Sequence, residues 1–469
     1  MLVIKYLNPE IFLSISIFSL LMIGVFIKNS FEIIYRLSLF VIFLIILIIL
    51  SGDNEPTKIF SESFTIDRFS LYSKVLIVIA TFFVLLMSKK YIVDIKNNKF
   101  EYPIIILLSI LGMFIMVSSN DLILFYLGLE LQSLALYILA SIDRDNIKSS
   151  EAGVKYFVLS ALSSGLLLYG CSLIYGFTGS TNFEEIASSG DFNVGTIFGM
   201  VFILVGLAFK VSAVPFHMWT PDVYQGSPTS VTSFFSVVPK IAGIIIFIKF
   251  MYLPFQGVLN QWQYILVFMS IASMILGAVA AIGQTNIKRL MAYSSIGHIG
   301  YAIAGIAAGT ENGFKSTLVY ISIYIVMNIG AFACILLMKR GGKYIEEIEE
   351  LSGVSKNHPM MSFGLLIILF SLAGIPPLAG FFAKFYIFMA VIESEMYTLA
   401  IVGLVTTVLS AFYYIRIIKI MYFDEPKKPF EKFVDYRIHG PIVLSCILLV
   451  SFFIYPSILN EIVSNISIF

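Results

Sequence analysis

Residues 194–216 read VGTIFGMVFILVGLAFKVSAVPF, an apolar run of membrane-spanning length with a single charge, Lys210, five residues before Pro215. A transmembrane helix needs about 20 apolar residues, and this run is long enough. A lone ammonium at that depth costs several kcal/mol unless it has a partner or gives up its proton. The stretch therefore predicts a membrane helix whose lysine has a functional role.

The rest of the chain has the same character. Of its 469 residues, 59% are hydrophobic and 13% are charged, and the mean hydropathy is +0.94. The apolar runs predict an all-α, polytopic membrane protein of about 14 transmembrane helices. They lie near 10–27, 32–51, 70–88, 103–118, 121–141, 153–176, 196–216, 229–253, 263–284, 289–308, 314–338, 360–376 running on to 378–393, 396–421 and 440–462. These runs leave no room for a soluble catalytic domain.

The distribution of positive charge predicts the orientation. Of the 30 Lys and Arg residues, 20 fall on one side of the predicted spans, 4 fall on the other, and 6 lie within or at the ends of spans. The positive-inside rule places the richer side in the cytoplasm. We therefore expect the loops at 89–101 and 422–438 to be cytoplasmic and both termini to face outward.

Prolines interrupt two of the predicted spans. In LAFKVSAVPFHMWTPD (207–222) they are Pro215 and Pro221, and in SLAGIPPLAGFFAKFYIF (371–388) they are Pro376 and Pro377. Each proline lacks an N–H and frees a carbonyl four residues earlier. Broken backbone within a membrane is tolerated only where it is buried in protein or lines a wet cavity. Two broken helices with charged neighbours are typical of transporters, although Gly and Pro are also common in ordinary membrane helices.

The two breaks occupy corresponding positions, which predicts two inverted five-helix repeats. We expect a three-helix segment at 1–102, a first repeat at 103–254, a second repeat at 255–421, and a cytoplasmic loop with the last helix at 422–469. An odd number of spans per repeat gives the two copies opposite orientations.

Ionisable residues within apolar runs are the candidates for chemistry. They are Glu130, Lys155, Lys210, Lys240, His298 and Lys384. Such residues are rare in membranes and mark proton or ion pathways. For Glu130 the alternative is a structural partner for a lysine, and for His298 it is a hydrogen-bonded core histidine.

Other ionisable residues carry less weight. Lys74 and Lys249 lie near predicted helix ends, where we expect them to snorkel toward water. His217 follows the first break and could serve the same wet cavity. Pro239, directly before Lys240, frees the carbonyl of Phe235 and favours a hydrated spot.

Several signals are missing from the sequence. Cys171, Cys334 and Cys446 are isolated, and no phosphate-binding or dinucleotide-binding glycine motif or haem-type histidine pair is present. We therefore expect no redox cofactor and no metal in this chain.

Five motifs resemble the antiporter-like subunits of respiratory complex I, NADH:quinone oxidoreductase. They are LGLELQSLALYILAS (127–141), EAGVKYFVLSALSSGLLLYG (151–170), GLAFKVSAVPFHMWTPDVYQGSPT (206–229), KRLMAYSSIGHIGYA (288–302) and AGIPPLAGFFAKFYIF (373–388). The resemblance covers at least residues 100–440. One departure from many relatives is Ala135, where a proline often stands, and it lies away from the charged positions.

The resemblance implies a proton path over the six candidate residues. Glu130 and Lys210 would form the input pair, Lys240 and His298 would relay along the midplane, and Lys384 would lie on the exit side. It also implies that NADH, FMN, iron–sulfur clusters and quinone are bound by partner subunits. The expected partners are a subunit M-like neighbour, the small multi-helix subunits and the lipid bilayer of a bacterial inner membrane, with no nucleic acid. The alternatives are a subunit of a cation/proton antiporter and a structural spacer subunit.

Overall fold

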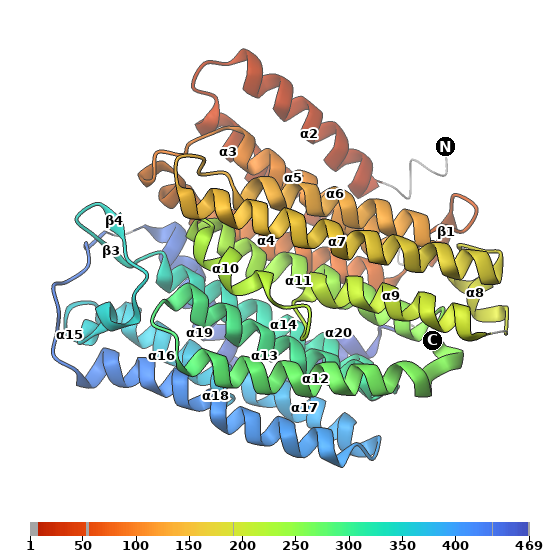
Figure 1. Ribbon diagram of the computed structural model, residues 1–469. Helices are drawn as coiled ribbons and strands as arrows, with labels where there is room; N and C mark the ends of the chain where they lie inside the picture. Colours follow the sequence, from red (N-terminus) through yellow and green to blue (C-terminus); the bar gives the residue numbers. More distant parts are fainter. Residues whose placement is uncertain (1–7, 53–55, 191, 434, 468–469) are drawn as a thin grey trace.

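The computed structural model describes residues 8–52, 56–190, 192–433 and 435–467, and long helices dominate them (Figure 1). Twelve of these helices are long and apolar enough to cross a membrane. The interrupted pair α16 (Pro359–Ala373) and α17 (Ala379–Glu393) adds one further span, and the shorter apolar helix α19 (Tyr436–Ser451) adds another. The prediction of an all-α membrane protein of about 14 spans is confirmed.

The helices before the first break are α2 (Asn8–Phe26), α3 (Phe31–Ser51), α4 (Arg68–Asp94), α5 (Glu101–Ser118), α6 (Leu122–Ala140), α7 (Ile147–Thr178), α8 (Phe183–Ser188) and α9 (Val194–Val211). Those between the breaks are α10 (Trp219–Gly226), α11 (Thr229–Tyr252), α12 (Leu259–Ile282), α13 (Ile287–Ala307), α14 (Glu311–Ile335) and α15 (Val354–Asn357), with 3-10 turns η1 (Gln256–Val258) and η2 (Ile348–Leu351). After the second break come α18 (Tyr397–Phe423), α19 and α20 (Ser457–Ser464).

Both predicted helix breaks are present. α9 ends at Val211, and Ser212 takes the left-handed conformation with φ 67° before α10 begins at Trp219. α16 ends at Ala373, and Gly374 takes the same conformation with φ 85° before α17 begins. A left-handed residue after a helix satisfies its last carbonyls and turns the chain aside. Each break therefore leaves helix ends within the fold.

Close glycine contacts join the first two helices of each predicted repeat. A Cβ atom on Gly112 of α5 would lie 2.5 Å from the backbone nitrogen of Gln132 on α6. A Cβ atom on Gly277 of α12 would lie 2.5 Å from the backbone nitrogen of Gly297 on α13. Only glycine permits such approach of two helices. A close glycine contact between the first two helices of both halves supports the prediction of two repeats. The boundaries of the repeats stay a prediction.

α11 lies at the centre of the bundle. All of its residues are buried, and it packs against α4, α5, α9, α13 and α14. A membrane helix that exposes no face to lipid is surrounded by protein. The lysines on α11 therefore lie in the protein interior.

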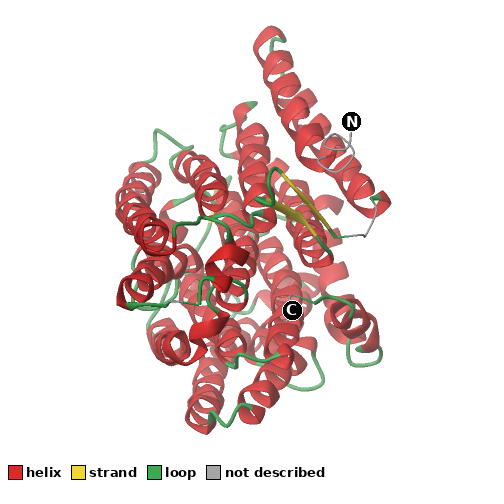
Figure 2. Ribbon diagram, turned by 90° about the vertical axis from the view of Figure 1, so that its right-hand side faces the viewer, coloured by secondary structure: helices red, strands yellow, loops and turns green. Residues whose placement is uncertain are grey.

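The two ends of the bundle carry different loops. The hairpin of β1 (Thr57–Ile59) and β2 (Phe64–Ile66), with Thr57 paired to Ile66, lies at the end where both termini are marked (Figure 2). The hairpin of β3 (Lys339–Arg340) and β4 (Lys343–Tyr344) lies at the opposite end, near α15 (Figure 1). The segregation agrees with the expected sidedness, and the direction of the membrane crossing stays a prediction.

Candidate functional site

Three of the candidate lysines are buried in the bundle, and among the described residues none of them has a carboxylate in contact, a property that Lys249 shares. Lys210, Lys240 and Lys384 are 8%, 1% and 4% exposed. In the part of the chain that the structure describes, none of them forms an ion pair, and each ammonium donates to hydroxyl or carbonyl oxygens instead. A buried cation without a counter-ion is costly, so these three positions need a reason beyond stability.

Lys210 lies in the last turn of α9 among hydroxyl groups. Its Nζ donates to Ser133 Oγ of α6 at 2.7 Å and to Ser160 Oγ of α7 at 2.8 Å. Tyr137 Oη donates to the same Ser160 Oγ at 2.6 Å, and the Tyr137 ring lies 5.9 Å from the ammonium. The hydroxyls can accept from an ammonium or donate to an amine, so the site tolerates both protonation states.

Glu130 lies one turn before Ser133 on α6 and is half-buried. Its Oε1 is buried and has no hydrogen-bond partner among the described residues. The carboxylate lies within electrostatic reach of Lys210 but forms no direct ion pair with it. A buried oxygen without a partner is unusual and marks a functional or hydrated position. The expected pairing of Glu130 with Lys210 therefore stays a prediction, and among the described residues no direct contact joins the two side chains.

Lys240 lies at the centre of α11, directly after Pro239. Its Nζ donates to Ser295 Oγ of α13 and lies 5.6 Å from the centre of the Tyr224 ring. The carbonyl of Phe235, which Pro239 leaves without a helical donor, accepts a hydrogen bond from Tyr224 Oη at 3.2 Å. The freed carbonyl thus holds the tyrosine that faces the ammonium.

His298 is buried on α13, one turn after Ser295. Its Nδ1 lies 2.6 Å from Tyr320 Oη, and its Nε2 lies 3.3 Å from Tyr414 Oη. The ring is within electrostatic reach of both Lys240 and Lys384. An imidazole with hydroxyls on both nitrogens can pass a proton from one side to the other. A hydrogen-bonded core histidine would make the same contacts. That alternative does not account for the two lysines within electrostatic reach of the ring.

Lys384 lies near the start of α17, against the end of α16. Its Nζ donates to the carbonyls of Leu372 at 3.2 Å and Ala373 at 3.1 Å. These carbonyls belong to the last turn of α16, where the helix dipole favours positive charge. The ammonium also lies 5.0 Å from the centre of the Tyr301 ring. The break therefore supplies the polar environment of this lysine.

Lys155 lies away from these lysines. Its side chain is 43% exposed and pairs with Glu151 at 2.7 Å and with Asp222 at 3.1 Å. It lines a polar cavity of about 160 Å³ between α7 and α10, together with Lys148, Glu151, Asp222 and Gln225. The sequence placed Lys155 inside an apolar run, whereas the structure places it near the start of α7 at a helix-bundle end.

The interpretation of Lys74 and Lys249 as snorkelling side chains is wrong. Both are 1% exposed. Lys74 forms an ion pair with Glu10 of α2 at 2.6 Å. Lys249 donates to Thr65 Oγ1 at 2.9 Å and to the carbonyl of Val117 at 3.3 Å. Snorkelling requires a route to water, and the β1–β2 hairpin and α2 close that route.

His217 lies in the first break and is half-buried. Its Nδ1 is a buried atom without a hydrogen-bond partner among the described residues. Buried polar atoms of this kind are often satisfied by ordered water. This placement supports the expectation that the break adjoins a wet region.

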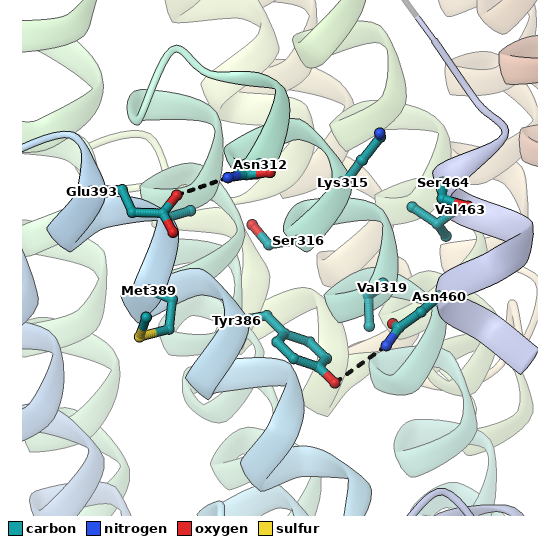
Figure 3. Close-up of a pocket in the computed structure, with 11 residues that line it drawn as sticks. Asn312, Lys315, Ser316, Val319, Tyr386, Met389, Glu393, Asn460, Val463 and Ser464 are labelled. Carbon is teal, nitrogen blue, oxygen red and sulfur yellow. Dashed lines mark hydrogen bonds between the residues drawn. The ribbon is translucent and has the colours of Figure 1, made fainter. Parts of the chain in front are cut away.

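A cavity of about 300 Å³ opens at the other end of α17, between α14 and α20. Figure 3 shows Asn312 donating to Glu393 at 2.8 Å and Asn460 donating to Tyr386 at 3.3 Å on its walls. Tyr386 lies two residues after Lys384, about 200° around the helix. The cavity therefore faces away from the Lys384 ammonium.

The tyrosines of this site were not among the residues that the sequence analysis selected. Tyr301 lies between two candidates, with its ring 6.4 Å from His298 and 5.0 Å from the Lys384 ammonium. Tyr224, Tyr320 and Tyr414 contact Lys240 or His298 as described above. Their hydroxyls occur in apolar runs, which is a weak signal because buried tyrosines are common.

The described residues contain no group of three or more His, Cys, Asp or Glu side chains that could hold a metal ion. Cys171, Cys334 and Cys446 are free thiols. The expectation that this chain carries no cofactor stays a prediction.

Comparison with known proteins gives consistent results. A family model described as NADH:quinone oxidoreductase/Mrp antiporter matches residues 119–410. The chain is 56% identical to NADH-quinone oxidoreductase subunit N of Pelagibacter ubique, over 99% of both chains. It is 50% identical to subunit N of Parvibaculum lavamentivorans, over 96% of this chain and 94% of the relative.

Solved structures share the fold. A chain of respiratory complex I from Thermus thermophilus with bound aureothin superposes with a TM-score of 0.84 at 27% identity, over 97% of this chain and 98% of that chain. A chain of the Mrp complex from Dietzia superposes with a TM-score of 0.88 at 20% identity, over 97% and 95%.

Proposed function

This chain belongs to the subunit N family of NADH-quinone oxidoreductase, and from that membership we propose that its buried Glu, Lys and His side chains carry protons across the membrane. Members of this family are multi-pass proteins of the bacterial inner membrane, and the twelve long apolar helices agree with that location. The observation that carries the proposal is that Lys210, Lys240 and Lys384 are buried without a carboxylate in contact and that His298 is within electrostatic reach of two of them.

The contacts between these lysines support a path along the bundle. From Lys210 it passes the hydroxyls of Ser133 and Ser160, and we propose that water carries the proton on past the stacked rings of Tyr156 and Trp219, which border the path. Trp219 lies 6.5 Å from the ring of Tyr224, which faces Lys240.

From Lys240 the path continues through Ser295 to His298, one helical turn away on α13. Tyr301, a further turn along, faces Lys384. Hydroxyl and imidazole groups can exchange protons directly or through water.

The polar cavity beside Lys155 is the proposed entrance. It lies at the end of the bundle that the charge distribution places in the cytoplasm, and Ala152 and Gly226 also line it. Tyr156 follows Lys155 in α7, and Ser160 lies one turn deeper against Lys210. Lys155 then acts at the entrance, with Glu130 and Lys210 as the first buried pair.

The energy comes from redox chemistry in other subunits of the oxidoreductase. We propose that NADH, FMN, iron–sulfur clusters and quinone are bound there, and that this chain contacts a subunit M-like neighbour and the small multi-helix subunits. The solved relatives are chains of multi-subunit membrane complexes. We propose that a change in the charge or hydration of Glu130 and Lys210 passes the redox energy on to proton binding in this chain, since pairing changes the proton affinity of a buried group.

The antiporter alternative is less well supported. The similarity to the Mrp complex is 20% identity and shows the fold alone, whereas relatives at 56% and 50% identity are subunits N of the oxidoreductase. A spacer subunit would have no use for uncompensated buried charge, which is destabilising.

Lys240→Met tests the proposal. Methionine keeps a similar volume and removes the charge. We expect an assembled complex, checked on native gels, that translocates fewer protons per NADH oxidised in membrane vesicles. Lys343→Met, at an exposed lysine of β4, is the matched control and should pump normally. Normal pumping by assembled Lys240→Met would remove Lys240 from the path.

A further inference from the structure

Asp222 joins three helices at the rim of the proposed entrance. Its Oδ1 accepts a hydrogen bond from Arg289 Nη1 of α13 at 2.7 Å, and its Oδ2 accepts one from Lys155 of α7 at 3.1 Å. Arg289 also donates to Gln225 Oε1 at 3.1 Å. α7 and α10 belong to the first predicted repeat and α13 to the second. Asp222 therefore ties α10 both to α7 of the first repeat and to α13 of the second.

Trp219 lies one turn before Asp222 on α10 and is 3% exposed. Its Nε1 donates to the carbonyl of Phe209 at 2.9 Å. Phe209 directly precedes Lys210, so this bond crosses the break from α10 back to the end of α9. The break removes the continuous helix that would otherwise fix the end of α9.

The same indole also contacts the helix that supplies a partner of Lys210. It stacks on the Tyr156 ring with a centroid separation of 4.4 Å and an interplanar angle of 10°. Tyr156 lies one turn before Ser160, whose hydroxyl accepts from Lys210 at 2.8 Å. Trp219 thus contacts the backbone next to Lys210, through Phe209, and the face of α7 next to Ser160, through Tyr156.

We propose that Asp222 and Trp219 are positioning residues for Lys210, with α10 as the rigid link that couples the Arg289 ion pair of the second repeat to the Lys210 site. The inference rests on the proposed function of Lys210. α10 is a single short helix, so a displacement of Asp222 moves Trp219 with it. The indole then changes the separation between the Lys210 ammonium and the Ser160 hydroxyl.

The alternative is an ordinary surface ion-pair network. Arg289 and Asp222 are 32% and 37% exposed, and exposed ion pairs contribute little to stability. That reading predicts that loss of the pair leaves pumping unchanged. The coupling through α10 predicts a loss, because misplacing a reacting group by ~1 Å can lower a rate by up to ~100-fold.

The experiment compares Arg289→Gln, Trp219→Phe, the double variant, Arg289→Lys and Lys210→Met in the assembled complex. The readout is protons translocated per NADH oxidised. We expect each of the first two to lower the ratio toward the value of Lys210→Met, and the double variant to lower it no further than the stronger single one, since residues acting as a unit are not additive. Arg289→Lys keeps the charge beside Asp222 and should restore part of the ratio, which a purely structural role in assembly does not predict.

The outcomes separate the two proposals. Normal pumping by Lys210→Met would remove the proposed function itself. A lowered ratio in Lys210→Met together with a normal ratio in Arg289→Gln would overturn the coupling alone. The coupling would also be overturned if the effects of Arg289→Gln and Trp219→Phe multiplied in the double variant. If Trp219→Phe fails to assemble, Asp222→Asn replaces it, because Asp222 is partly exposed and its loss leaves no cavity. A normal ratio in assembled Asp222→Asn also overturns the coupling.

Discussion

Replacing Lys384 with methionine separates the charge of this residue from its packing. Lys384 is 4% exposed, and its ammonium donates to the carbonyls of Leu372 and Ala373. Leaving a buried polar group unpaired costs about 1–3 kcal/mol. Removing a buried charge recovers a desolvation penalty that is still several kcal/mol per ion. The two effects oppose each other at similar size, so we expect Lys384→Met to assemble.

The same variant should lose pumping. Moving one proton against a driving force of about 200 mV costs roughly 4.6 kcal/mol, at about 2.3 kcal/mol per 100 mV. A thioether cannot bind a proton, so the path ends at this position. The assay is acidification or alkalinisation of membrane vesicles during NADH oxidation, normalised to complex assembled on native gels. Full pumping by an assembled Lys384→Met complex would refute the role of Lys384.

Replacing Lys384 with arginine should lower both assembly and pumping, for a different reason from methionine. A Cβ atom on Gly374 would lie 3.1 Å from Lys384 Cδ, so the side chain has little spare room. The larger guanidinium should overpack the break at a cost of about 1–3 kcal/mol, and it stays protonated throughout a cycle. We therefore expect Lys384→Arg to assemble less well than Lys384→Met and to pump no better. Assembly equal to the wild type would show that the break has more room than the Gly374 contact indicates.

Four further outcomes are expected. Glu130→Gln should cripple proton uptake by vesicles in an assembled complex while Glu130→Asp retains part of it, and a normal ratio in Glu130→Gln would contradict the paired-charge mechanism. Lys74→Met should leave Glu10 as an unpaired buried carboxylate, which destabilises the fold by about 3–5 kcal/mol, and the yield of assembled complex should fall. Adding Glu10→Gln should recover much of that yield, and equal yields for the single and double variants would show that the pair is not coupled. The hydrogen bond from Arg340 holds the pKa of Glu350 below its ordinary value. The stability that this interaction adds to the loop is present above the ordinary pKa of a glutamate and is lost as the pH falls through the lowered pKa. Hydrogen exchange in 339–351 should therefore rise on acidification, and Glu350→Gln should abolish that rise. Single cysteines in 89–101 and 422–438 should resist labelling from outside intact cells, and ready labelling would reverse the orientation.

Local rules accounted for the parts of the fold that the sequence predicted. Apolar run length set the number of spans, because hydrocarbon thickness fixes helix length. Pro215 and the Pro376–Pro377 pair located the breaks, because a missing N–H acts on the carbonyl four residues earlier. These signals depend on residues close together in the chain.

Contacts between distant helices could not be predicted in this way. Lys74 and Lys249 have the sequence context of snorkelling lysines, and only the covering elements decide whether a route to water exists. For Lys249 the cover is the β1–β2 hairpin, through Thr65. Lys155 shows the opposite error: its apolar sequence context predicted a buried side chain, but the side chain is 43% exposed and reaches the carboxylates of Glu151 and Asp222.

The two helix breaks serve their lysines by different physical means. At the second break, Lys384 lies against the open carbonyl end of α16, and the carbonyls of Leu372 and Ala373 accept hydrogen bonds from its ammonium. At the first break, the carbonyl of Phe209 is taken by Trp219, and Lys210 relies on the hydroxyls of Ser133 and Ser160. Hydroxyls serve an ammonium and an amine alike, whereas carbonyls only accept. Lys210, like Lys240 beside Ser295, therefore has hydroxyl neighbours that can contact either protonation state, and we propose that Glu130 and the link through α10 decide which state Lys210 adopts.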